Sequence, residues 1–275
     1  MARRMKVTRS WFFGWVFSLL AVPLSGADDQ PERGDDTNAA GVPPYKVTET
    51  EIQLPGVTIS RVTSEIRLEA VVCLEAGVLE YVVCRPGTFE HEAIFTTTAK
   101  PELLHAAMLL IGVEPYPQRH GLAEFWYEKA LEQKASRVKV EVEWTEEDGR
   151  KRVPLVSLLR SRRELDEQEK TDAVVEGWVF SGSFIHQNPE NGERAYAANR
   201  SGILVGIWPN PTVVIQYGLA EGNPYEGKDL GIEIREERMP KKGTKVQLVF
   251  SRFPSLDAPG EVEAKPSPSE KEKSK

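Results

Sequence analysis

The chain has 275 residues, of which 40% are hydrophobic, 28% charged and 8% aromatic. This composition is typical of a globular protein and excludes wholesale disorder or a collagen-like fibre. The length allows one large domain or two small ones. Two cysteines are too few for a disulfide-dense scaffold or a four-thiolate iron–sulfur cluster.

The N-terminal segment has the three parts of a secretory signal peptide. Four basic side chains precede an apolar run from Trp11 to Leu24, and the small residues Ser25-Gly26-Ala27 follow it. The run is shorter than the roughly 20 residues that a bilayer requires. We therefore expect residues 1–27 to be cleaved, which leaves a periplasmic or extracellular protein without stable membrane insertion. Retention of the segment as an anchor is the alternative.

The mature chain would be strongly acidic. Without residues 1–27, 31 Lys and Arg face 42 Asp and Glu, a net charge of −11. Nucleic acids and anionic lipids bind through basic side chains that displace counterions, so neither is an expected partner. The basic residues Arg160, Arg162 and Arg163 are followed at once by acidic ones, which is typical of a solvated helix face.

Composition divides the mature chain into three parts. Residues 28–56 begin acidic, contain glycine and proline, and are predicted to form a flexible lead-in. Residues 256–275 include PSPSEKEKSK and are predicted to form a disordered tail. Residues 57–255 carry regular apolar patterning and are predicted to form a single β-rich globular domain.

Short strands dominate the predicted domain. Ile66–Cys73 and Val78–Cys84 are rich in valine and separated by four residues, which predicts a β-hairpin. Val138–Trp144 alternates apolar with charged residues, and Asp148-Gly149 can turn the chain back along Arg150–Val153. Further strands are expected at residues 178–185, 203–208, 212–217 and 245–253.

One helix is clearly indicated, at Pro101–Ile111. Proline suits the first helical position, and Gly112 is a natural terminator. Apolar residues lie nearly all round this helix, so we expect it to be buried against a sheet. Residues 121–134 and 155–169 are candidates for one or two peripheral helices. The sequence thus predicts an α+β fold with a mainly antiparallel β-sheet and one buried helix.

The predicted hairpin places the two cysteines at its opposite ends. Aligning the apolar faces of its strands puts Cys73 beside Val78 and Cys84 beside Arg67. This separates the cysteines by about 20 Å at ~3.3 Å per residue. A disulfide requires Cα atoms within about 7 Å, so Cys73 and Cys84 are predicted to be unpaired. A redox pair or an intermolecular bridge are the alternatives.

The histidines offer one candidate cluster. Glu90-His91-Glu92 precedes a predicted strand, and His105 lies in the predicted helix. An extended segment directs His91 away from its two neighbours, so this segment alone cannot present all three side chains to a metal. The fold could still unite His91, His105 and one of the glutamates in a set suited to zinc or iron. Alternatively, His105 is a hydrogen-bonded core histidine and the Glu-His-Glu run caps a turn.

Four sequence blocks resemble the YdjY-domain family. They read LEYVVCRPGTFEHEAIF (79–95), AKPELLHAAMLLIGVEP (99–115), WVFSGS (178–183) and PKKGTKVQL (240–248). The resemblance spans about residues 60–253 and implies an exported bacterial protein without an established activity. It makes the matched residues Glu90, His91, Glu92 and His105 the candidate functional cluster. Some relatives carry a cysteine-rich, ferredoxin-like stretch, but this chain has only Cys73 and Cys84.

The leading functional hypothesis is an exported envelope protein that acts as a non-catalytic binding or assembly module. Its expected partner is a protein or an envelope polymer, and no cofactor is predicted. The alternative is a metal-dependent enzyme or metal-binding protein that uses His91, His105 and Glu90 or Glu92. A third possibility is a thiol-based redox role for Cys73 and Cys84. Whether any reaction is catalysed stays open at this point.

Overall fold

The computed structural model describes residues 44–116, 129–162, 174, 176–219, 225–227 and 230–254. The predicted signal peptide, the tail after residue 255 and the predicted helical residues 121–128 and 163–169 lie outside this part of the chain. No helix within it is long and apolar enough to cross a membrane.

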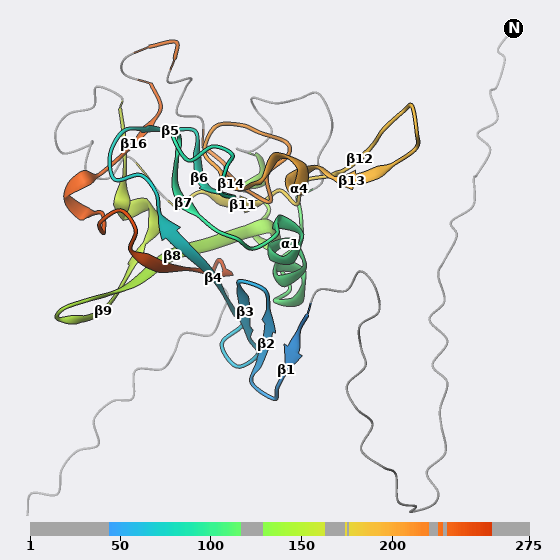
Figure 1. The fold of residues 1–275 in the computed structure, drawn as a ribbon, viewed down its shortest axis with the longest axis horizontal. Coiled ribbons are helices and arrows are strands. Elements are labelled where there is room, and N and C mark those ends of the chain that lie inside the picture. The colour runs from blue at the N-terminus through green and yellow to red at the C-terminus, as the bar shows by residue number, and fades with distance from the viewer. Residues whose placement is uncertain are drawn as a thin grey trace, which may run out of the picture. The chain divides into compact units, whose positions relative to one another are not determined.

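Strands make up most of the regular secondary structure in the described residues (Figure 1). The strands are β1 (Lys46–Val47), β2 (Glu51–Leu54), β3 (Val57–Ser60), β4 (Glu65–Val72), β5 (Val78–Leu79), β6 (Tyr81–Cys84), β7 (Ala93–Thr96), β8 (Arg137–Glu146), β9 (Gly149–Pro154), β10 (Leu159–Ser161), β11 (Trp178–Phe180), β12 (Ile185–Gln187), β13 (Arg194–Tyr196), β14 (Ile203–Gly206), β15 (Ile215–Tyr217), β16 (Ile232–Ile234) and β17 (Lys245–Arg252). The helices are α1 (Pro101–Leu110) and α4 (Ala197–Ser201), with 3₁₀ turns η1 (Lys134–Ser136), η2 (Leu155–Leu158) and η3 (Glu236–Arg238).

Eight strands close into a barrel. They pair in the order β4–β17–β8–β11–β15–β14–β6–β7, and β7 pairs with β4 to complete the ring. β6–β7 and β14–β15 are parallel, and the other neighbours are antiparallel. Outside the ring, β3, β2 and β1 continue the sheet from β4, and β9 extends it from β8.

The alternating residues of the barrel strands form one hydrophobic core. On β8, Val138, Val140 and Val142 are fully buried, and on β17 Leu248 and Phe250 are fully buried beside them. A period of two puts such residues on one face of a strand, and each buried side chain of this size contributes about 1.5–3 kcal/mol. The apolar alternation read from the sequence is therefore what fills the barrel.

The α+β prediction is wrong, because the described structure is a mostly β closed barrel. The helix predicted at Pro101–Ile111 exists as α1, but it is not buried all round. Its Leu103, Leu104, Ala107 and Met108 pack into the core, whereas Leu109 and Leu110 are 49% and 60% exposed. Sequence periodicity indicates which face of a strand is apolar, but it carries no signal that the two ends of a sheet meet.

The hairpin predicted between Ile66–Cys73 and Val78–Cys84 is also wrong. β4 pairs along one edge with β17 and along the other with β3 and β7. β6 pairs with β14 and β7, so β7 lies between the two strands expected to be neighbours. Ile66–Cys73 forms β4 nearly as predicted, but Val78–Cys84 divides into β5, which pairs with β16 in a separate sheet, and β6. A short connection does not determine pairing when a third strand can enter.

Two further segments differ from the sequence-based expectation. Residues 46–54, assigned to the lead-in, form β1 and β2, and β2 pairs with β3 from Glu51 opposite Ser60. Residues 155–161 of the predicted helix 155–169 form η2 and then β10, which pairs with β16. β10 takes its conformation from β16, which is distant in sequence, whereas β1 and β2 form consecutive hairpins with the neighbouring β3. The hairpin of β8 and β9, in contrast, forms as predicted.

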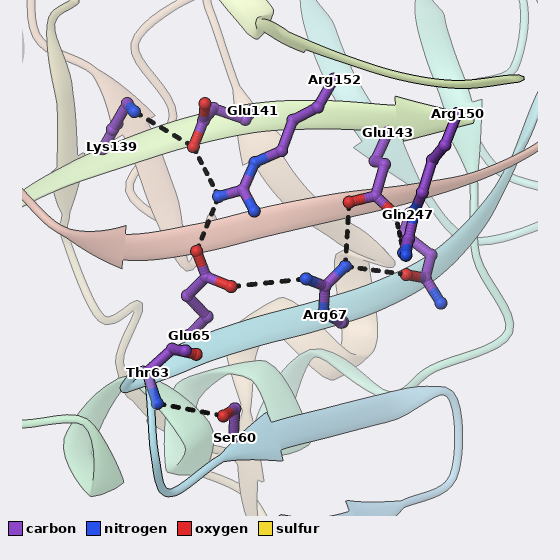
Figure 2. Close-up of polar contacts among 10 residues, drawn as sticks. All are labelled: Ser60, Thr63, Glu65, Arg67, Lys139, Glu141, Glu143, Arg150, Arg152 and Gln247. Atoms are coloured by element: carbon purple, nitrogen blue, oxygen red, sulfur yellow. Dashed lines mark hydrogen bonds and ion pairs between the residues drawn. The ribbon is translucent and has the colours of Figure 1, made fainter. Parts of the chain in front are cut away.

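A chain of ion pairs covers the outward face of β4, β8 and β9. Figure 2 shows these side chains, which we call the charged ladder: Lys139, Glu141, Arg152, Glu65, Arg67, Glu143 and Arg150. Arg67 lies 3.1 Å from Glu143, whose side chain is only 6% exposed. Because Glu143 is held between Arg67 and Arg150, its buried charge is compensated.

Removing the ion pair between Arg67 and the buried Glu143 should destabilise the barrel. We expect Arg67→Met to lower the free energy of unfolding by about 1–3 kcal/mol, because Glu143 then keeps only one cationic partner. Lys139→Met is the matched control and should cost less than about 1 kcal/mol, because the Lys139 ammonium is 37% exposed. Urea unfolding measures both, and equal losses would contradict the assigned role of Glu143.

Candidate functional site

The predicted residues Glu90, His91 and Glu92 lie in the turn between β6 and β7. Glu90 accepts a 2.5 Å hydrogen bond from the Gly87 amide, which holds the pKa of this carboxyl below its usual range. Glu92 accepts a 2.6 Å hydrogen bond from the Tyr225 hydroxyl. The His91 side chain is 72% exposed and lies 3.7 Å from Glu92. The two carboxylates thus hold local structure, and His91 faces solvent.

The fourth predicted residue, His105, lies on α1 in a different environment. Its Nδ1 is 2.9 Å from the Gly182 carbonyl oxygen and 2.9 Å from the Tyr196 hydroxyl. Its ring meets those of Phe180 and Tyr196 edge to face. Burial lowers the pKa of His105 below 6.5, so the ring is neutral at pH 7.

The structure therefore does not unite the four residues. The contacts of His105 are made with β11, the segment after it and the end of β13, and not with the Glu-His-Glu turn. Within the described part of the chain, no group of three or more His, Cys, Asp and Glu could hold a metal ion. The hypothesis of a metal centre on His91, His105 and Glu90 or Glu92 has no geometric support there.

His105 instead contacts Tyr196, the residue that directly precedes the short helix α4. This helix is held in place by hydrogen bonds to α1 and to the segment after β11. Asn199 of α4 accepts a 3.2 Å hydrogen bond from the Glu102 amide in the first turn of α1, and its side-chain amide donates at 2.7 Å to the Glu102 carboxylate. Ser183 accepts a 3.1 Å hydrogen bond from the Ala198 amide in the first turn of α4. Each helix start is thus capped by a residue outside that helix.

Two glycines allow this close approach. Gly182 has φ +76°, and a Cβ there would lie 2.8 Å from the Pro115 Cβ. Gly202, directly after α4, has φ +75°, and a Cβ there would lie 2.8 Å from the Thr88 methyl group. Both positions therefore require glycine on conformational and steric grounds. As a result, α4 and the glycine that ends it meet three sequence blocks singled out above: 79–95 through Thr88, 99–115 through Glu102 and 178–183 through Ser183.

A pocket of 620 Å³ opens beside α4, under the hairpin of β12 and β13. In Figure 1 this hairpin extends outward next to α4 and α1. We call it the hairpin pocket, and its lining residues are Glu102, His186, Asn188, Glu193, Arg194, Ala195, Tyr196, Asn199 and Arg200. Its volume is within the range of about 300–1,000 Å³ that is common for small-ligand sites.

The comparison with known protein families found a match that covers the sequence blocks meeting at α4. The model of the YdjY domain matches residues 57–251. The chain belongs to the YdjY-domain family. The match spans every strand of the barrel, α1, α4 and the hairpin pocket. No curated protein and no solved structure matches the chain.

Sequence reasoning missed most residues of the pocket in this YdjY domain. Asn199 and Arg200 belong to none of the motifs considered in the sequence analysis. The segment AANRSG, with glycine at its end, carries the signal of a short helix with a glycine C-cap. Residues 188–192 read NPENG, a composition that favours a tight turn and so indicates the hairpin. Their proximity to α1 depends on tertiary contacts and has no local signal.

The two thiols of the YdjY domain, a half-buried Cys73 and a buried Cys84, are separated by a strand. Cys73 continues the β4–β7 register opposite Ile94, and Cys84 pairs with Thr96 on the other edge of β7. Two interstrand spacings of ~4.8 Å put the Cα atoms about 10 Å apart, beyond the reach of a disulfide. Both cysteines are free. The intervening strand β7, and not the hairpin register assumed above, keeps them apart.

Burial should make both thiols unreactive. It raises the pKa of Cys73 to about 12, with a further contribution from the nearby Cys84, and it raises the pKa of Cys84. Because the thiolate is the reactive form, we expect no fast reaction of native protein with a chromogenic disulfide reagent at pH 8, and two equivalents after unfolding in urea. If one thiol equivalent reacted rapidly in the native protein, this result would instead support the hypothesis of a thiol-based redox role.

Glu176 has a buried carboxylate whose desolvation outweighs the attraction of the nearby Lys139 and Arg137. Both of its carboxylate oxygens are buried without a hydrogen-bond partner, and burial raises its pKa to about 7. Arg137 donates to the Glu176 carbonyl oxygen at 3.2 Å, not to the carboxylate, and stacks 3.6 Å above the Phe253 ring. A perturbed carboxyl can mark a functional site, but Glu176 does not line the hairpin pocket.

Glu176 should make stability depend on pH. Its folded-state pKa of about 7 exceeds the ordinary 4.5, so the folded protein binds the proton more tightly and stability falls as pH rises from about 4.5 to about 7. Glu176→Gln should therefore be more stable than wild type by about 1–3 kcal/mol at pH 8, and similar to it at pH 4.

Urea unfolding at both pH values measures this difference. Glu237→Gln, in the exposed turn η3, is the control and should change stability at neither pH. A Glu176→Gln variant that loses stability at pH 8 would show that the carboxylate is compensated in the folded protein.

Proposed function

We propose that this YdjY-domain protein is exported to the cell envelope, where it binds a polar envelope polymer in the hairpin pocket without converting it chemically. The observation that carries the proposal is the fixed arrangement of polar side chains around this pocket. Tyr196 is held by His105 and by the Gly182 carbonyl, which accepts from its hydroxyl at 3.0 Å. Asn199 is held by Glu102. Such preorganisation reduces the entropy cost of binding a ligand.

The chemistry of the groups near the pocket supports binding over catalysis. His105 is neutral at pH 7, and its Nδ1 is occupied by a carbonyl and a phenol. Burial raises the pKa of the Tyr196 phenol, so its hydroxyl stays protonated and acts as a hydrogen-bond donor. These groups position one another, and neither is activated as a nucleophile.

The polar lining supports a polymer ligand more than a folded protein partner. Stable protein interfaces bury about 800 Å² per partner around an apolar, aromatic centre. The hairpin pocket is instead concave, and charged or amide side chains form most of its wall. Those groups match the hydroxyl, amide and charged substituents of an extended polar chain. The flexible ends predicted from the sequence would suit tethering in the envelope, and the predicted signal peptide supports export.

Filling the pocket tests the proposal without removing any structural hydrogen bond. Ala195 lines the pocket on β13, and Ala195→Trp should abolish co-sedimentation of the folded protein with purified envelope glycan. Ile185→Trp is the matched control, because Ile185 is 51% exposed on the same hairpin and does not line the pocket. This control should bind like wild type, and both variants should unfold cooperatively.

Two outcomes would contradict the proposal. One is co-sedimentation that is equal for wild type and Ala195→Trp. The other is turnover of an envelope glycan by the wild-type protein that is lost in His105→Asn, because this would make the site catalytic.

A further inference from the structure

We infer that the hairpin pocket recognises a saccharide that carries a carboxylate, such as a hexuronate unit, through the guanidinium groups of Arg194 and Arg200. The inference rests on the proposed binding function and names the class of its ligand. It starts from two arginines of the pocket, Arg194 and Arg200, whose guanidinium groups form no ion pair with a described residue.

Arg194 and Arg200 enter the pocket from two elements, the strand β13 and the helix α4. Their guanidinium groups make no hydrogen bond and no ion pair with any residue in the described part of the chain. The arginines of the charged ladder differ sharply, because Arg67 and Arg152 each contact two carboxylates (Figure 2). Two guanidiniums without an ion-pair partner thus lie in one pocket, where they are available to an anionic ligand.

Glu102 and Glu193 balance the formal charge of the pocket, but neither forms an ion pair with Arg194 or Arg200. The Glu102 carboxylate accepts from Asn199 at 2.7 Å and lies 3.7 Å from the Lys100 ammonium. The Glu193 carboxylate accepts from the Asn191 amide at 3.4 Å. The two guanidiniums are thus left for a ligand, and their fork of N–H donors matches the two oxygens of a carboxylate.

The remaining wall matches a sugar ring better than an isolated anion. The amide oxygens of Asn188 and Asn199 accept from Glu190 and Glu102, and each side-chain amide keeps at least one N–H that can donate to a sugar hydroxyl. Tyr196 adds an aromatic surface, against which the apolar face of a pyranose ring can pack. A volume of 620 Å³ also accommodates more than a single carboxylate group. Together these features favour a carboxylate presented on a saccharide.

Calorimetry with three soluble probes tests the inference on the full mature protein. Trigalacturonate carries both the sugar and the carboxylate, maltotriose carries only the sugar, and triglutamate carries the carboxylate on a peptide. We expect trigalacturonate to bind at least tenfold more tightly than either of the others, with an affinity that falls as salt is raised.

Charge-removing variants assign the binding to the two arginines. Arg194→Gln and Arg200→Gln should each weaken trigalacturonate binding about tenfold or more, and the double variant should abolish it. Both side chains are exposed, so these variants keep the fold. Arg61→Gln is the matched control, because Arg61 is exposed and does not line the pocket, and it should bind like wild type.

Several results would overturn the inference. Equal binding of maltotriose would remove the role of charge, and equal binding of triglutamate would remove the role of the sugar. Trigalacturonate binding that both arginine variants retain would place the ligand elsewhere. If glycan co-sedimentation is lost in Ala195→Trp while wild type fails to bind trigalacturonate, the ligand class is wrong but the proposed function stands. If wild type binds no envelope glycan at all, the proposed function itself fails.

Discussion

The structure depends on one pairing, that of β7 with the end of β4. Val71 and Val72 of β4 lie opposite Thr96 and Phe95, and this short contact joins the two ends of the sheet into a ring. It is possible because β3 covers only the first half of the same edge, from Glu65 to Leu68. Without this division of one edge between two partners, the sheet would remain open and its apolar face would be exposed to water.

In the closed barrel, one face of each strand points into the core and the other points outward. Inward-facing residues such as Val140, Leu248 and Phe250 become fully buried. Outward-facing residues of β4, β8 and β9 lie side by side and form the charged ladder (Figure 2). The candidate site lies outside this regular part. A helix of five residues such as α4 is not stable alone, so α4 depends on its contacts with the barrel connections and with α1.

The sequence predicted what local signals determine. The period of two along β8 and the turn before β9 produced a correct hairpin, and Pro101 and Gly112 bounded α1 correctly. Pairings between distant segments could not be predicted, because many strands share the same apolar pattern. Arg67 and Gln247 are in contact although they are 180 residues apart. For the same reason, His105 was recognised as a candidate residue, but its partners Gly182 and Tyr196 were not.

The position of β17 has a consequence for how the molecule is made. This strand lies between β4 and β8 in the barrel, yet it is the last strand of the described chain. The barrel therefore cannot close until almost the whole polypeptide has left the ribosome, because β17, which joins β4 to β8, is synthesised after the other barrel strands. Slow, non-local assembly of this kind prolongs the unfolded state of the nascent chain. Until β17 is made, the edges of β4 and β8 that it joins stay unpaired, so the nascent chain carries two open strand edges for most of its synthesis.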